Sequence, residues 1–296
     1  MIDRPHALSP ATASVGRATA LVKGGGELGT ATAVALWRAG WRVIVGELPR
    51  PTVLRRQLSL AEAAFTGCVI REGVRAFRVA SPARAYKLAQ TPAVIPLYVG
   101  PLAPLVAAVS PALVVDARMR RGLPSERQRG EAALVVGLGP DLRAGEHVDF
   151  VVETCPGPDL GQIITDGTAR PHAPLSRAPG SLAEEYVRAA CAGRWRTERT
   201  IGEVVAAGDA LGWLDGTPLY APIAGSLRGL VHDDIAVPAG LKLAGVHPGD
   251  WQRKEAGIGF RAATVAASVV ALAAREAAAL DAPPHYRGQP LTAAAK

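Results

Sequence analysis

The chain of 296 residues contains few cysteines, few aromatic residues and few lysines. Its cysteines, Cys68, Cys155 and Cys191, are far apart and form no CxxC pair, which argues against a disulfide framework and favours a reducing, cytoplasmic location. Aromatic residues make up 5% of the chain, too few for a platform that stacks nucleotide bases. Five of its 33 basic residues are lysine, so the net charge of +7 reflects an arginine excess of the kind common in GC-rich genomes. We therefore expect no nucleic-acid partner.

Long apolar runs and metal-binding spacings are also missing. The longest apolar run, at 262–274, is shorter than the about 20 residues that span a bilayer, so we expect no membrane association. The six histidines show no HxH or HxxxH spacing, which predicts no metal site, and we expect His172 and His232 on the surface. Residues 1–18 and 283–296 are expected to be flexible tails. No G-x-S-x-G or Walker lysine pattern occurs, which disfavours an esterase or a P-loop kinase.

The first half of the chain alternates short β-branched runs with helical segments. Such alternation predicts an α/β fold with a mostly parallel sheet covered by helices, and ligands gather at the carboxyl ends of such strands. The expected strands are 19–23, 42–47, 93–99, 112–118, 132–139 and 148–154, and the expected helices include 81–90 and 102–109.

A glycine-rich turn with the pattern G-x-G-x-x-G follows the first expected strand and begins the first helix. Its spacing suits a dinucleotide, because the first glycine makes the turn, the second admits a pyrophosphate and the third packs helix on strand. Glu47 ends the next strand, where an acidic residue binds ribose hydroxyls. The alternative is a turn whose glycines serve packing alone. The residues expected to bind the cofactor here are Gly24, Gly25, Gly26, Glu27 and Gly29.

Arginines and further glycines lie near this turn in the sequence. Arg50, Arg55 and Arg56 follow Glu47, and guanidinium groups bind phosphate well, so Arg55 and Arg56 are candidate cofactor ligands. They are equally consistent with solvated helix residues. Gly137 and Gly139 form a second turn after a strand and are expected to line the same crevice.

Three residues at strand ends are candidates for chemistry. Glu153 and Cys155 stand beside a Pro-Gly turn, where a thiolate favoured by nearby arginines or helix N-termini would be a nucleophile or soft metal ligand. No histidine at a diagnostic spacing accompanies Cys155, so an inert thiol is the alternative. Asp116 closes the strand "ALVVDAR" and either orients a ligand or caps a turn.

The sequence pattern changes in the second half of the chain, which contains short expected strands and frequent glycine turns. "VAAGDALG" at 205–212 and "VPAGLKLA" at 237–244 share the pattern V-x-A-G-x-x-L, 32 residues apart. This repeat indicates two interlocked hairpin halves, with chance similarity in an alanine-rich chain as the alternative. Residues 259–280 predict one helix that packs back on a domain.

These motifs in order resemble the YqeB-type accessory family of the selenium-dependent molybdenum hydroxylase system. The resemblance runs from about residue 21 to 246 through "KGGGELGTATAVALWRAG", "ELPRPTVLRRQLSLAEAAFTGCVIREGVRA", "VVGLGPDLRAGEHVDFVVET" and "VAAGDALGWLDG". It implies a Rossmann-like domain at 19–185, related to the XdhC maturation proteins. It further implies a biotinyl/lipoyl-like barrel-sandwich domain at 186–250, before a C-terminal helix at 251–282 that packs back.

The chain departs from this family at two places. Relatives tend to have E-T-x-R-G-H-x-L-G where this chain has "ETCPGPDLG", so the arginine and histidine positions are Pro156 and Pro158. A role that those side chains perform in relatives is therefore absent here. The β domain also lacks a lysine at the expected hairpin tip, and we expect no covalent biotin or lipoate.

Three functions follow from these observations. The first is an accessory protein that helps mature a molybdenum hydroxylase and binds a molybdopterin-type dinucleotide or NAD(P), with that enzyme or its maturation proteins as partners. The second is an NAD(P)-dependent oxidoreductase, against which stands the lack of a clear proton donor. The third is a non-catalytic docking scaffold. Homo-oligomerisation is left open by the sequence.

Overall fold

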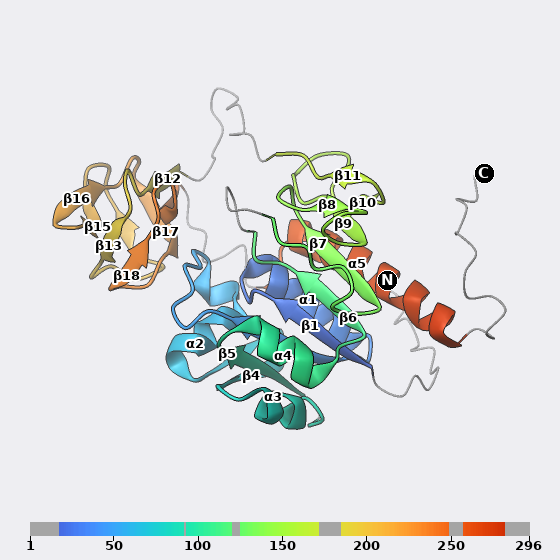
Figure 1. Ribbon diagram of the computed structural model, residues 1–296. Helices are drawn as coiled ribbons and strands as arrows, with labels where there is room; N and C mark the ends of the chain where they lie inside the picture. The colour runs from blue at the N-terminus through green and yellow to red at the C-terminus, as the bar shows by residue number, and fades with distance from the viewer. Residues whose placement is uncertain (1–17, 92, 120–124, 172–184, 249–256, 282–296) are drawn as a thin grey trace, which may run out of the picture.

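The computed structural model describes residues 18–91, 93–119, 125–171, 185–248 and 257–281. Within these ranges the chain forms a large α/β part, a smaller antiparallel part and a long helix that follows it (Figure 1). His172 and most of the expected tails lie outside the described residues. No helix in these ranges is both long and apolar enough to cross a membrane.

A nine-stranded, mostly parallel sheet forms the centre of the α/β part. Its order is β10-β9-β7-β6-β1-β2-β5-β4-β3, and only the edge strands β3 and β10 pair antiparallel to their neighbours. The inner strands are buried on both faces, which explains their near-continuous apolar sequences. The strands are β1 Thr19–Lys23, β2 Arg42–Glu47, β3 Cys68–Arg71, β4 Val74–Val79, β5 Val94–Val99, β6 Leu113–Asp116, β7 Leu134–Leu138, β9 Phe150–Val152 and β10 Ile163–Ile164, with the separate pair β8 Arg143–Ala144 and β11 Gly167–Thr168.

All six strands expected in this half are present, and the mostly parallel sheet is confirmed. The hairpin of β3 and β4 was not expected. Its turn consists of Glu72 and Gly73, both with positive φ (51° and 77°), which is the geometry of a tight two-residue hairpin. Only one of these two residues is a glycine, so the turn signal in the sequence is weak.

Helices cover both faces of the sheet. One face packs under α1 and α5 and the other under α3 and α4, so the apolar side chains form two separate cores. α1 ends next to Gly40, whose φ of 92° suits the residue after a helix C-terminus. The helices are α1 Glu27–Arg38, α2 Ala63–Thr66, α3 Pro82–Leu88, α4 Leu102–Val109 and α5 Phe260–Asp281, with the 3-10 turns η1 Arg56–Leu58 and η2 Leu60–Glu62.

Two four-stranded antiparallel sheets form what we call the antiparallel module. One sheet has the order β12-β19-β17-β14 and the other β16-β15-β13-β18, around a core that contains the fully buried Trp195. The strands are β12 Glu185–Arg188, β13 Gly193–Arg196, β14 Val204–Val205, β15 Ala210–Leu214, β16 Thr217–Tyr220, β17 Gly225–Leu230, β18 Ile235–Val237 and β19 Lys242–His247.

The 32-residue repeat expected from the sequence extends over the whole module. Moving each of β12, β13, β14 and β15 by 32 residues gives β16, β17, β18 and β19, and the same shift converts the strand order of one sheet into that of the other. The bulge in the pairing of β15 with β16, at Leu211, recurs at Leu243 in β19. Each half contributes strands to both sheets, so the two halves are interlocked.

α5 packs beside α1, and substitutions in α5 test how much this contact contributes to the stability of the fold. Leu272 is 2% exposed in the core shared with α1, whereas Phe260 at the start of α5 is 81% exposed. We expect Leu272→Ala to lower the free energy of unfolding by about 2–5 kcal/mol, because it leaves a cavity. Phe260→Ala is the control and should change it by less than about 0.5 kcal/mol in urea denaturation. Equal effects of both changes would contradict the packing described.

Candidate functional site

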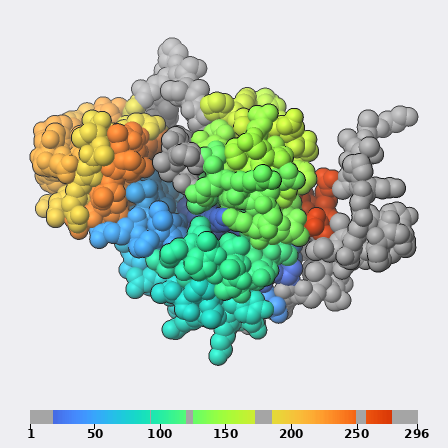
Figure 2. Space-filling model, viewed as in Figure 1, coloured from blue at the N-terminus to red at the C-terminus, as the bar shows by residue number. Residues whose placement is uncertain are grey.

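The candidate site lies where the strand order of the large sheet reverses. β2 lies on one side of β1 and β6 on the other, so the carboxyl ends of these strands open a crevice at a topological switch point. Figure 2 shows a hollow here, in which blue atoms from near the N-terminus are visible between light-blue and green atoms. The glycine turn that connects β1 to α1 lies at this edge of the sheet.

The three glycines of the turn meet different constraints. Gly24 has a φ of 96°, and a Cβ on Gly29 would lie 1.9 Å from the carbonyl oxygen of Gly24, so the fold itself requires both glycines. Gly26 has an ordinary φ of −66°, and among the residues that the structure describes, the only atom within 4 Å of a built Cβ is Cγ2 of Val53, at 3.9 Å. Within the described ranges, therefore, neither backbone conformation nor packing explains why position 26 is a glycine.

Glu47 lies against the turn, as the sequence predicted. Its Oε2 accepts a hydrogen bond from the N–H of Gly25 at 2.7 Å and its Oε1 one from the N–H of Leu48 at 2.7 Å. Burial raises the pKa of Glu47 above its usual range, although these N–H groups and the charge of Arg118 oppose the shift. A carboxylate has about four acceptor sites, so two remain for ligand hydroxyl groups.

A polar network that the sequence did not reveal lies on the β6 side of the crevice. Arg118 packs its backbone against Gly24 and donates from Nε and Nη2 to the two oxygens of Asp116, at 2.9 and 2.7 Å. Gln128 donates to Asp116 at 2.6 Å and accepts from the buried Lys23 at 2.6 Å. Burial alone would raise the pKa of Asp116, but Arg118 and Gln128 lower it overall. Asp116 therefore holds a guanidinium in place beside the glycine turn.

Gly137 and Gly139 lie near the end of β7, next to β6 in the sheet. Gly137 is buried, and a Cβ there would lie 2.6 Å from Cδ1 of Leu142, so a side chain at this position would force Leu142 to move. Gly139 has a φ of 86°, and its built Cβ would lie 3.0 Å from the sulfur of Met119. Met119 follows Arg118 and also has a positive φ, 51°, which is unusual for a residue with a side chain.

The arginines expected to bind phosphate have protein partners in the structure. Arg55 forms an ion pair with Glu27 in the first turn of α1, with 3.5 Å between Nε and Oε2. Arg56 donates to the carbonyl of Leu230 in the antiparallel module at 2.7 Å. Arg50 donates to the carbonyl of Asp234 at 2.6 Å. Their assignment as cofactor ligands stays a prediction, and only Arg55 lies beside the glycine turn.

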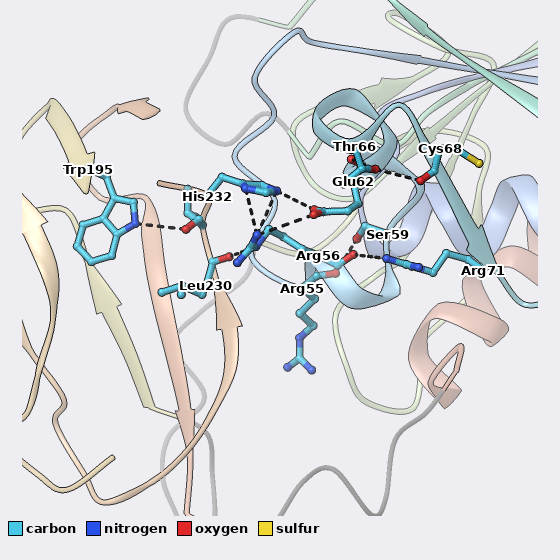
Figure 3. Close-up of polar contacts among 11 residues, drawn as sticks. Arg55, Arg56, Ser59, Glu62, Thr66, Cys68, Arg71, Trp195, Leu230 and His232 are labelled. Carbon is cyan, nitrogen blue, oxygen red and sulfur yellow. Dashed lines mark hydrogen bonds and ion pairs between the residues drawn. The ribbon is translucent and has the colours of Figure 1, made fainter. Parts of the chain in front are cut away.

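His232, expected on the surface, is partly buried against the α/β part, with its side chain 21% exposed. Its ring stacks on Phe65 with 3.7 Å between ring centroids, and its Nε2 lies 2.8 Å from Oε2 of Glu62 (Figure 3). Arg56 Nη1 lies 3.1 Å from a ring nitrogen. The partners come from a segment far away in the sequence, and the local pattern around His232 carries no signal for them.

Glu153 and Cys155 lie at the end of β9. The Glu153 carboxylate accepts from the N–H groups of Cys155 at 2.7 Å and Arg170 at 2.8 Å. Burial would raise the pKa of Glu153, but these N–H donors lower it overall. Glu153 thus organises the loop, and its role in chemistry, like that of Cys155, stays a prediction. In the described part of the chain no three His, Cys, Asp or Glu residues are grouped to hold a metal ion.

Fold and site together define an α/β protein with a glycine turn at the switch point of a mostly parallel sheet. No model of a known protein family matches the chain. It is similar to the uncharacterized protein YqeB of Escherichia coli (strain K12), with 33% identity over 234 residues, which are 79% of this chain and 43% of that protein. This similarity supports the assignment of the chain to the YqeB family. The chain spans less than half the length of that relative.

The raised pKa of Glu47 predicts a pH dependence of stability. Between the usual glutamate pKa and the raised one, the folded protein binds more protons than the unfolded protein, so this group lowers stability as pH rises through that window. Glu47→Gln removes the titration. We expect the variant to gain stability relative to the wild type as pH increases from about 4 to neutral, measured by urea denaturation. A difference that stays constant with pH would contradict the burial of this carboxylate.

Proposed function

We propose that this chain binds a dinucleotide-type cofactor at the glycine turn of a Rossmann-like domain and acts as an accessory protein in the maturation of a molybdenum hydroxylase. The observation that supports ligand binding is the open space at Gly26. The fold requires glycine at positions 24 and 29. At position 26 a side chain would be excluded only by a ligand that approaches the backbone. In dinucleotide-binding turns that ligand group is the pyrophosphate.

Further contacts around the turn support an anionic, ribose-bearing ligand. The first turn of α1 begins at Gly26 without a side-chain cap, so its N–H groups and the helix dipole favour a phosphate. The Glu47 carboxylate would accept from ribose hydroxyls but repel a 2′-phosphate. The proposal therefore narrows the cofactor to a dinucleotide with an unmodified ribose, either NAD or a molybdopterin-type dinucleotide, rather than NADP.

The accessory role is supported by the resemblance to the YqeB-type family and by the antiparallel module. Its two interlocked halves are consistent with the biotinyl/lipoyl-like domain that the resemblance implies. The hairpin tip between β15 and β16 consists of Asp215 and Gly216. A covalent biotin or lipoate needs a lysine at such a tip. We therefore assign the module to docking, which also keeps the scaffold function as a second candidate if no ligand is found.

The test is mass spectrometry of small molecules released from freshly purified, denatured protein, for the wild type and for Gly26→Ala and Gly26→Asp. We expect a dinucleotide from the wild type, about tenfold weaker retention in the alanine variant and loss in the aspartate variant, whose carboxylate repels the pyrophosphate. Gly259→Asp is a matched control, because Gly259 also precedes a helix and no atom of the described residues lies within 4 Å of a Cβ built on it.

The outcomes separate the three functions. Release of a pterin dinucleotide supports the accessory protein, and release of NAD favours the oxidoreductase. If the wild type releases nothing and binds neither NAD nor a pterin dinucleotide when these are added, cofactor binding is refuted. The docking scaffold then remains, and co-purification with a molybdenum hydroxylase would support it.

A further inference from the structure

The segment Val53–Arg56, which we call the bridging segment, contacts the glycine turn and the antiparallel module alternately. In the described part of the chain, Cγ2 of Val53 is the one atom within 4 Å of a Cβ built on Gly26, at 3.9 Å. The next residue, Leu54, packs into the core of the module, where a Cβ on Gly229 would lie 2.6 Å from Cγ of Leu54. Neighbouring residues of this segment, which runs through a bend into η1, therefore lie against different parts of the protein.

The next two residues repeat this alternation. Arg55 pairs with Glu27 in the first turn of α1, on the side of the glycine turn. Arg56 donates from Nε to the carbonyl oxygen of Leu230 at 2.7 Å, on the side of the module. The N–H of Leu230 in turn donates to the carbonyl of Leu54 at 2.9 Å. The bridging segment therefore pairs with β17 through its backbone as well as through its side chains.

The chain on either side of the segment is tied to the glycine turn itself. Before the segment, Glu47 accepts the N–H of Gly25, and after it the N–H of Ala61 donates to the carbonyl of Gly25 at 2.9 Å. Glu62 follows directly and binds His232 of the module, with Phe65 stacked on the same imidazole (Figure 3). The path from the turn to the module is thus short and made of direct contacts.

We propose that docking of the antiparallel module sets the wall of the crevice, with Leu54 and Arg56 as positioning residues for the ligand. The contacts of Leu54 and Arg56 described above are with the module. They hold the backbone that carries Val53, which faces Gly26, and Arg55, which pairs with Glu27 of the turn. The statement about the ligand rests on the proposed function. The statement about the wall concerns the protein alone, so the two can be tested separately.

The experiment uses the full chain with Leu54→Ala and Arg56→Ala as variants and Arg38→Ala as the matched control. Arg38 also donates to a backbone carbonyl, that of Glu72 at 3.0 Å, but it lies at the opposite end of α1 from the turn. Amide hydrogen exchange of residues 24–29 is measured in the ligand-free proteins. Calorimetric titration with ADP-ribose, which carries a pyrophosphate between two riboses, measures binding, and urea denaturation reports the stability of each variant.

We expect exchange at 24–29 to become about tenfold faster in both variants and unchanged in the control. Arg56→Ala removes a hydrogen bond from a charged donor and Leu54→Ala removes apolar packing, and either loss frees the segment. The Kd for ADP-ribose should rise by about tenfold in the two variants. A purely structural role would lower stability without changing the exchange of residues 24–29.

Wild-type exchange at 24–29 in both variants would overturn the inference, and so would an equal increase in Arg38→Ala. If the wild-type protein does not bind ADP-ribose, NAD is excluded as the cofactor instead, and the proposed cofactor class fails if a pterin dinucleotide does not bind either. The exchange data then still decide whether the module positions the wall. If urea denaturation shows that one of the two variants does not fold, the hydrogen exchange of the other variant decides.

Discussion

The contact between Gly29 and the carbonyl of Gly24 is the constraint on which the α/β part depends. A Cβ at position 29 would lie 1.9 Å from that oxygen, so α1 can approach β1 this closely only without a side chain. The short distance lets the hydroxyl of Thr30 donate to Gly25 and accept from Leu60, each at 2.9 Å. One hydroxyl thus joins the turn, the helix and the chain that follows β2.

The same region shows how buried polar groups are used in this protein. Asp116, Gln128 and Lys23 are nearly inaccessible to solvent, and each has partners in the network beside the turn. Burial of such groups costs free energy unless they are hydrogen-bonded. Removal of one partner would therefore leave another polar group buried without a hydrogen bond. Their geometry is consequently rigid, and it holds Arg118 in a fixed position with respect to Gly24.

Local patterns predicted the elements well and the contacts between distant segments poorly. The strands at 19–23 and 42–47 have the expected bounds because they are buried on both faces and their sequences are continuously apolar. The repeat in the module could be found because both halves form the same arrangement of strands from similar residues. In contrast, the partners of Arg56 and His232 are about 170 residues away, and nothing in their neighbourhoods specifies them. Arg118 was missed because a single arginine after a strand has no distinctive pattern.

The packing of α5 has a consequence for how the protein is made. α1 and α5 share one apolar core, although the whole antiparallel module separates them in the chain. While the ribosome is still adding the module, the apolar side of α1 has no partner helix and is open to nascent-chain binding factors. The large sheet can therefore complete its layer on that face only after α5 has left the exit tunnel, which makes this protein dependent on late events in its own synthesis.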